Sequence, residues 1–306
     1  MTPGSVVEMM EDELDVSVVL PVYNERGHLR TEIERIQRAL KDSPYSFEII
    51  VVDDGSNDGS ENDLPTIEGI RLIRHSRNRG TGAARRTGTV AARGRVVVWT
   101  DVDMTYPNDE IPMLVKELDG YDHVVGARRT EAGTQRFLRV PAKWFIRKLA
   151  SYLVETNIPD LNSGLRAFRR DVAMQYVHQL PNGFSCVTTL TMSFLSNGYQ
   201  IKYVPIDYFP RAGHSKFHWW RDTKRYLLQV VRMTLSYNPL KVFLPIGALL
   251  FLLGFGKLVY DLVDKDFRVA INTLLILLAS LQAITVGLLA DLVVRATRPL
   301  SQIPPA

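Results

Sequence analysis

The sequence predicts an α/β fold with a mostly parallel sheet, followed by an interfacial helix and a two-helix membrane hairpin. Three observations lead to this prediction. Short apolar runs alternate with segments of helical periodicity as far as residue 216 of the 306-residue chain. One apolar run, within residues 94–107, ends in two aspartates one residue apart. Two long apolar runs then follow near the C-terminus.

Composition excludes several classes of function. The net charge of +4, without a basic and aromatic recognition module, gives no indication of nucleic-acid binding. The single cysteine, Cys186, excludes an intramolecular disulfide and a cysteine-cluster zinc site, and we expect it to be a buried small hydrophobe. Residues 1–15 are acidic and lack the apolar core of a secretory signal, so we expect a loose tail.

The sequence predicts three strands before residue 80, with a clear helix between the first and the second. Residues 16–22 and 47–52 are continuous apolar runs, as expected of strands covered on both faces, and 70–74 is a third candidate. Residues 28–41 carry leucine and isoleucine at helical spacing. The glycines at 80–82 then open a small-residue helix. They indicate either an anion site at the helix N-terminus or tight packing.

The fourth predicted strand, residues 96–100, leads into Asp101 and Asp103. Because strand side chains alternate between faces, the two carboxylates point the same way if the strand continues that far. Ligands in open α/β sheets collect beyond the carboxyl ends of the strands. Two like charges this close need a cation or hydrogen-bond donors, and oxygen ligands suit Mg²⁺ or Mn²⁺. An isolated pair could instead cap a turn, but the motifs around this one favour a metal site.

The remaining part of this region continues the alternation of elements. The sequence predicts a strand at 124–126, a basic and aromatic helix at 134–155, a loop leading to a strand at 157–168, helices at 171–180 and 186–196, and an edge strand at 201–205. Residues 211–216 combine arginine, serine and lysine around a glycine, a combination suited to gripping a diphosphate.

The C-terminal part predicts membrane attachment. Residues 217–241 form an amphipathic, basic and aromatic segment typical of an interfacial helix. The runs 242–260 and 269–290 each approach the roughly 20 residues that a membrane-spanning helix needs, within a hairpin over 242–298. The connector 261–268 is net acidic and the outer flanks are basic, which predicts two spans of the cell membrane and a cytoplasmic catalytic domain. Glycines in the first span permit close helix approach and a homo-oligomer.

Six short motifs, in order, resemble the family 2 glycosyltransferases of the GT-A fold, a Rossmann-like α/β fold. They lie at residues 20–25, 52–56, 78–84, 101–103, 163–166 and 211–216. Within this family the chain is similar to the polyprenyl-phosphate sugar synthases, the class of dolichyl-phosphate mannose synthase, some of which carry a hairpin of the same kind. The resemblance covers residues 16–216, the expected catalytic domain.

The resemblance implies a role for each matching residue. The residues expected to bind the nucleotide-diphosphate sugar are Pro21, Tyr23, Glu25, Asp53, Asp54, Asp101, Arg211, Ser215 and Lys216. The resemblance implies that Asp103, with Asp101, holds the metal, and that Arg211 and Lys216 join them in catalysis. The residues expected to hold the acceptor phosphate are Arg128, Arg139, Lys143 and Arg166.

Two departures from the family pattern bear on the substrates. Thr105 stands where the mannose synthases often carry glutamine, which favours a UDP-sugar over GDP-mannose. Residues 184–192 contain threonines and lack the acidic residue that many relatives use as a general base. A sugar hydroxyl needs such a base, whereas a phosphate monoester, with a second pKa of about 6, is already an oxyanion at neutral pH. The missing base therefore favours a lipid phosphate as acceptor.

The sequence thus predicts a membrane-anchored inverting transferase that uses Mg²⁺ or Mn²⁺. It would move one sugar from a nucleotide diphosphate to polyprenyl phosphate at the cytoplasmic leaflet. Two alternatives stay open. The first is a glycosyltransferase acting on a hydroxyl of a glycan or glycolipid, with Asp160 as a candidate base. The second is a catalytically silent membrane subunit that binds a nucleotide sugar.

Overall fold

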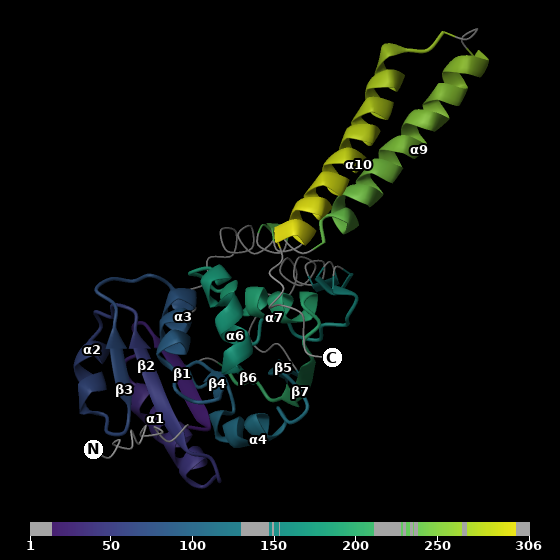
Figure 1. The fold of residues 1–306 in the computed structure, drawn as a ribbon. Helices are drawn as coiled ribbons and strands as arrows, with labels where there is room; N and C mark the ends of the chain where they lie inside the picture. The colour runs from purple at the N-terminus through teal and green to yellow at the C-terminus, as the bar shows by residue number, and fades with distance from the viewer. Residues whose placement is uncertain are drawn as a thin grey trace, which may run out of the picture.

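The structure is a computed structural model of an α/β domain followed by two long C-terminal helices (Figure 1). It describes residues 14–129, 147–148, 150–152, 154–210, 228, 231–232, 235, 238–264 and 268–297. The predicted interfacial helix at 217–241 therefore lies mostly outside the described residues, and positions 1–13 of the predicted N-terminal tail lie wholly outside them.

In the part of the chain that the structure describes, seven strands form one mostly parallel sheet, as predicted. They are β1 (Val16–Val22), β2 (Phe47–Asp53), β3 (Arg71–Arg74), β4 (Val96–Trp99), β5 (His123–Arg128), β6 (Arg166–Arg169) and β7 (Ile201–Ile206), in the order β3-β2-β1-β4-β6-β5-β7. The strand β6 runs antiparallel to both of its neighbours, and the other pairs are parallel. The predicted edge position of the strand near residue 201 is confirmed, since β7 ends the sheet.

Helices cover both faces of the sheet and give the three layers expected of this fold class. The helices and 3₁₀ turns of the domain whose bounds the described residues give are α1 (Leu29–Lys41), α2 (Ser60–Asp63), η1 (Leu64–Thr66), α3 (Thr81–Ala91), η2 (Asn108–Glu110), α4 (Ile111–Lys116), α6 (Arg170–Tyr176), η3 (Val177–Gln179) and α7 (Cys186–Ser196). One apolar core lies under α1 and α4, and a second lies under α3, α6 and α7.

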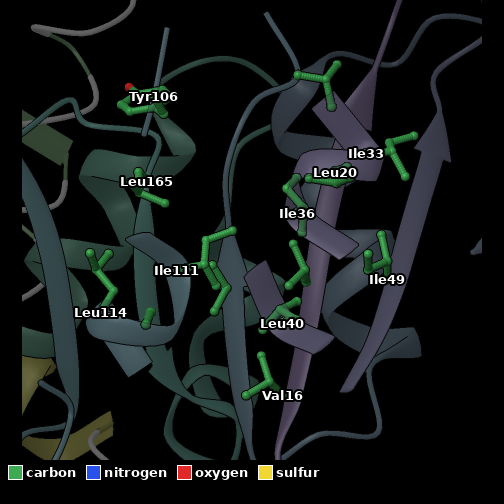
Figure 2. Packing of buried hydrophobic residues seen from close by; sticks show 14 of the residues in the cluster. Val16, Leu20, Ile33, Ile36, Leu40, Ile49, Tyr106, Ile111, Leu114 and Leu165 are labelled. Atoms are coloured by element: carbon green, nitrogen blue, oxygen red, sulfur yellow. The ribbon is translucent and has the colours of Figure 1, made fainter. Parts of the chain in front are cut away.

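The helix α1 packs through the apolar stripe that its sequence predicts. Its buried side chains recur at helical spacing, with charged residues between them. Figure 2 shows this stripe packed against the sheet; the labelled residues are Ile33, Ile36 and Leu40 of α1 with Leu20 of β1 and Ile49 of β2. The first turn of α1 thereby lies near the predicted metal site, because Glu32 bonds to Asn108, which in turn bonds to the backbone of Asp101.

On the opposite face, Trp99 anchors the end of β4. It is fully buried, and its ring meets the ring of Phe168 edge-on with 5.0 Å between centroids. Its indole N–H donates a hydrogen bond of 2.9 Å to the hydroxyl of Thr89 in α3. Trp99 is the last residue before residues 100–108, the aspartate loop, which carries Asp101 and Asp103. It is therefore fixed both by packing and by a hydrogen bond.

The glycine-rich start of α3 serves tight packing. The backbone N–H groups of Gly82 and Ala83 donate to the carbonyl oxygen of Asn182, over 2.8 and 3.3 Å. A Cβ on Gly82 would lie 2.1 Å from the carbonyl oxygen of Pro181. These donors already have a protein acceptor, so of the two interpretations of the glycine motif the structure supports packing.

We predict that Gly82→Ala lowers the free energy of unfolding by about 1–3 kcal/mol, the usual cost of forcing a methyl group into a packed site. Chemical denaturation of the full chain in detergent measures this change. Gly183→Ala is the matched control, because among the described residues no atom beyond its two chain neighbours lies within 4 Å of the Cβ it would add. Equal stability of the two variants would contradict the packing interpretation.

The two C-terminal helices, α9 (Leu240–Asp264) and α10 (Ile271–Thr297), pack along each other and are long and apolar enough to cross a membrane. Glycines let them approach closely: a Cβ on Gly247 would lie 2.5 Å from Ile284, and one on Gly254 would lie 2.8 Å from Leu277. At the far end of the hairpin, buried Asp261 accepts a hydrogen bond of 3.1 Å from the backbone N–H of Ala270. Gly247 and Gly254 thus allow α9 and α10 to pack closely against each other within one chain.

Candidate active site

The aspartate pair lies in a loop just beyond the carboxyl end of β4. The strand ends at Trp99, one residue earlier than predicted, so the alternation of faces does not extend to Asp101 and Asp103. The hydroxyl of Thr105 donates a 2.6 Å hydrogen bond to the Asp103 carboxylate. Between the two aspartates and this threonine, Met104 has a φ of 61°, in the left-handed region. The loop, and not strand geometry, therefore orients the two carboxylates.

Asp101 is held by a buried arginine of α3. The Arg85 side chain is only 3% exposed, and its Nη2 donates to Asp101 Oδ1 over 2.7 Å. Its guanidinium also lies 5.5 Å from the ring centroid of Trp99. Burial alone would lower the pKa of Arg85, but the Asp101 carboxylate outweighs burial and raises that pKa above its ordinary value. The guanidinium therefore stays charged and fixes Asp101.

A second loop closes over this ion pair. The backbone N–H of Gly164 donates a 2.7 Å hydrogen bond to the hydroxyl of Tyr106. A Cβ on Gly164 would lie 2.6 Å from Asp101 Oδ2 and 3.0 Å from Arg85 Nη2. Only glycine allows the backbone to approach the ion pair this closely. The motif at 163–166 thus shapes the surroundings of Asp101.

Arg166, expected to hold the acceptor phosphate, lies inside the protein. It is fully buried, and its guanidinium donates to the carbonyl oxygens of Ser163 and Val187 and to the hydroxyl of Thr191. Burial, together with the charge of Arg85, lowers the pKa of Arg166 to about 10. This position joins β6 to α7 and disfavours direct contact of Arg166 with an acceptor phosphate.

The residues expected to bind the donor gather at the carboxyl ends of two neighbouring strands. Pro21 is in β1, and the backbone then turns into the loop that carries Tyr23 and Glu25. Asp53 ends β2 opposite Val22 of β1 in the sheet register, and Asp54 follows directly. The strand β1 also pairs with β4, which leads to the aspartate loop. The topology therefore brings the described donor-binding candidates together at the carboxyl ends of the central strands.

Asp53 and Asp54 also organise the loops in which they lie. Asp54 is buried and accepts hydrogen bonds from the backbone N–H groups of Arg79 and Gly80, over 3.0 and 2.7 Å. Its carboxylate also lies 2.7 Å from Nδ1 of His75, a partner that the sequence did not suggest. Asp53 accepts from the backbone N–H of residue 56 over 3.0 Å. These contacts tie the loops that follow β2 and β3 together.

Arg128, at the end of β5, forms a bidentate ion pair. Its Nε and Nη2 donate to the two carboxylate oxygens of Asp160 over 2.7 and 2.9 Å. Burial raises the pKa of Asp160, but the hydrogen bonds and charge of Arg128 outweigh burial and leave that pKa below its ordinary value. Asp160 is therefore a weak proton acceptor, which disfavours the candidate base of the hydroxyl-acceptor alternative.

The segment that leads into residues 211–216 is attached to the aspartate loop. The backbone N–H of Phe209 donates a 2.9 Å hydrogen bond to the carbonyl oxygen of Thr105. Beside it, the rings of Tyr208 and Tyr106 meet edge-on with 5.3 Å between centroids. Five predicted site residues lie outside the described residues: Arg139, Lys143, Arg211, Ser215 and Lys216.

The donor set of the aspartate loop fits a divalent cation whose shell a substrate completes. Among the described residues, no group of three or more histidine, cysteine, aspartate or glutamate side chains could hold a metal ion. Asp101 and Asp103 supply hard carboxylate oxygens, and Mg²⁺ sites commonly use one or two carboxylates plus substrate phosphates. The pair therefore suits a metal bound together with a diphosphate.

Sequence reasoning missed Arg85, although a signal for it was present. Gly82, Arg85 and Thr89 recur at helical spacing on the buried face of α3. A charged residue on such a small-residue face must find a partner inside the protein. His75 had no comparable signal, because its contact with Asp54 depends on how two loops meet.

Two family models match this chain. The model of glycosyl transferase family 2 matches residues 17–177, and the model of the GtrB C-terminal hairpin matches residues 238–296. The chain therefore belongs to glycosyl transferase family 2, as the six motifs indicated, and is a glycosyltransferase. With its C-terminal hairpin it is a membrane protein with two spans.

Individual relatives agree with this assignment. Undecaprenyl-phosphate 4-deoxy-4-formamido-L-arabinose transferase from Pectobacterium carotovorum is 32% identical over 257 residues, which cover 81% of this chain and 75% of that protein. The transferase of the same name from Aeromonas hydrophila is 36% identical over 163 residues, 51% of this chain. That match spans about half of the Aeromonas protein, 49% of its length.

A solved structure shows the same fold. Glucosyl-3-phosphoglycerate synthase from Mycobacterium tuberculosis, in complex with Mn²⁺, UDP and glucosyl-3-phosphoglycerate, superposes with a TM-score of 0.57. The match covers 73% of this chain and 80% of that one at 23% sequence identity. At this identity the likeness establishes the GT-A fold and leaves the substrates open.

Proposed function

We propose that this protein is an inverting glycosyltransferase that moves one sugar from a nucleotide diphosphate to polyprenyl phosphate. The acceptor assignment rests on one observation: among the described residues, the two places where a general base was expected, α7 and Asp160, offer no carboxylate suited to that role. The helix α7, where many relatives place a general base, has buried threonines and no acidic residue. The nearby Asp160 is paired with Arg128 and has a lowered pKa. An acceptor that is already an oxyanion needs neither.

On the donor side, the nucleoside would lie against Pro21, Tyr23 and Glu25, above Asp53 and Asp54. The position of these residues at the carboxyl ends of β1 and β2 supports this assignment, because open α/β sheets bind ligands there. A UDP-sugar is the favoured donor. Thr105 in place of glutamine supports it, and the mycobacterial synthase, which shares the fold, binds UDP.

Asp103 and Asp101 would hold Mg²⁺ or Mn²⁺ against the diphosphate. When bound, the ion supplies positive charge to the leaving group. Arg85 holds the Asp101 carboxylate in place through the 2.7 Å ion pair. Arg211, Ser215 and Lys216 would close over the diphosphate. The hydrogen bond from the backbone N–H of Phe209 to Thr105 of the aspartate loop supports this assignment.

The reaction needs no proton transfer from the acceptor. A phosphate oxygen would attack the anomeric carbon from the face opposite the diphosphate and form a new carbon–oxygen bond. The bond to the diphosphate breaks as its electron pair leaves with the nucleoside diphosphate, so the configuration at that carbon inverts. Arg128, Arg139 and Lys143 would hold the acceptor phosphate.

The membrane hairpin supports a lipid acceptor. The names of the Pectobacterium and Aeromonas relatives describe transfer to undecaprenyl phosphate, a polyprenyl phosphate. A lipid of this kind presents its phosphate at the membrane surface, where the start of α9 and the end of α10 would lie if the two helices span the membrane. The basic flanks of the hairpin favour the cytoplasmic leaflet as the side of the reaction.

A transfer assay on the purified full chain in detergent tests this proposal. Labelled UDP- and GDP-sugars are offered with Mn²⁺ or Mg²⁺ and a short polyprenyl phosphate, and the matching polyprenol serves as control. We expect lipid labelling with one UDP-sugar and none on the polyprenol. Transfer to the polyprenol or to a glycolipid hydroxyl at a comparable rate would contradict the acceptor assignment.

A further inference from the structure

The side-chain amide of Asn108, which is fully buried, closes the aspartate loop. Its Nδ2 donates a 3.1 Å hydrogen bond to the carbonyl oxygen of Asp101. Its Oδ1 accepts a hydrogen bond from the hydroxyl of Thr100 at the start of the loop. Asp101 and Asp103 therefore lie in a loop whose two ends are joined by a single side chain.

Asn108 is itself held by Glu32 of α1. The same Nδ2 donates a 2.6 Å hydrogen bond to Glu32 Oε1, and the Glu32 residue is fully buried. The other carboxyl oxygen, Oε2, is buried without a hydrogen-bond partner in the part of the chain that the structure describes. Burial raises the pKa of Glu32 above its ordinary value. A buried polar atom in this state costs roughly 1–3 kcal/mol, so the arrangement reduces stability.

Glu32 occupies a position in α1 at which an apolar side chain would avoid this cost in stability. It lies in the first turn, between the buried apolar residues Leu29 and Ile33 that pack against the sheet. An apolar side chain there would be the ordinary choice for the inner face of an amphipathic helix. One turn later, Arg35 also contacts the loop, with a 3.4 Å hydrogen bond to the carbonyl oxygen of Tyr106. The helix α1 thus supports the aspartate loop through two polar side chains.

We propose that Glu32 is a positioning residue for the two aspartates. Through Asn108 it fixes the backbone at Asp101 and thereby sets how tightly the pair holds a divalent cation. The inference rests on the proposed function, in which Asp101 and Asp103 hold Mg²⁺ or Mn²⁺. Groups that orient metal ligands in this indirect way typically change metal affinity by about 10- to 100-fold when they are replaced.

Titration of Mn²⁺ into the full chain with UDP, followed by electron paramagnetic resonance of free Mn²⁺, tests this role without measuring turnover. We expect Glu32→Leu and Asn108→Ala each to weaken Mn²⁺ binding by about 10- to 100-fold. The double variant should be no weaker than Asn108→Ala alone, because the proposed effect of Glu32 on the loop passes through Asn108. Glu32→Gln should bind like the wild type, since its amide oxygen still accepts from Asn108. Glu34→Gln, half-exposed on the same helix, is the matched control.

Melting temperatures of the same samples separate positioning from simple stability. Glu32→Leu with a changed melting temperature and wild-type Mn²⁺ affinity would overturn the inference. Glu32→Gln as weak as Glu32→Leu would overturn it too, because the hydrogen bond would then not be the basis. If Glu32→Leu does not fold, Asn108→Ala and Glu32→Gln decide the matter. If the wild-type protein binds no Mn²⁺ in the presence of UDP, the proposed metal site is overturned together with this inference. If it binds Mn²⁺ but transfers no sugar to the lipid, only the proposed function is contradicted.

Discussion

Asp103→Asn is expected to lower turnover by about 100- to 1000-fold or more while the protein stays folded, the range seen when a group that stabilises transition-state charge is removed. The amide keeps an oxygen that can accept the 2.6 Å hydrogen bond from Thr105, so the loop retains its shape. It removes the negative charge with which the aspartate pair would hold the metal against the leaving diphosphate. Initial rates of lipid labelling over a range of Mn²⁺ concentrations measure the effect.

Asp119→Asn is the matched control for this charge change, because Asp119 is exposed in the turn after α4. It should leave the rate unchanged. If the Asp103→Asn defect disappeared at high Mn²⁺, Asp103 would govern metal affinity alone. Turnover close to wild type at every Mn²⁺ concentration would remove Asp103 from the proposed mechanism.

The sheet could be predicted because local signals agree with it. Continuous apolar runs such as β1 and β2 are bounded by polar loops, and the helix between them has a clear apolar stripe. The antiparallel direction of β6 could not be predicted in the same way. Its sequence is short, and its direction follows from where the preceding loop enters the sheet between β4 and β5. Strand direction depends on tertiary connection, and sequence patterns report it only indirectly.

The candidate site was predictable in part for the same reason. Residues at strand ends, such as Asp54 and Asp101, follow from the pattern of strands and loops. Their partners do not, because His75 and Arg85 reach them from other elements. The glycines at the start of α3 illustrate a different limit: the same residues serve anion binding or tight packing, and only the acceptor at Asn182 distinguishes the two.

The ion pair between Arg85 and Asp101 predicts unequal costs for losing either partner. Asp101→Ala leaves a guanidinium that is 3% exposed without its carboxylate, and we expect a loss of about 3–5 kcal/mol in the free energy of unfolding. Arg85→Met leaves an aspartate whose side chain is 32% exposed and which water can solvate. We expect a smaller loss there, of about 1–3 kcal/mol.

A double-mutant cycle in metal-free buffer with a chelator measures this directly, since it excludes any contribution from metal binding. Denaturation of the full chain in detergent gives the three differences in unfolding free energy. The double variant should be more stable than the sum of the single losses implies, by about 0.5–3 kcal/mol, because neither charge is then left unpaired. Additive losses would mean that the two residues act independently. A larger loss for Arg85→Met than for Asp101→Ala would mean that packing of the Arg85 side chain against Trp99, and not its charge, is what stabilises the site.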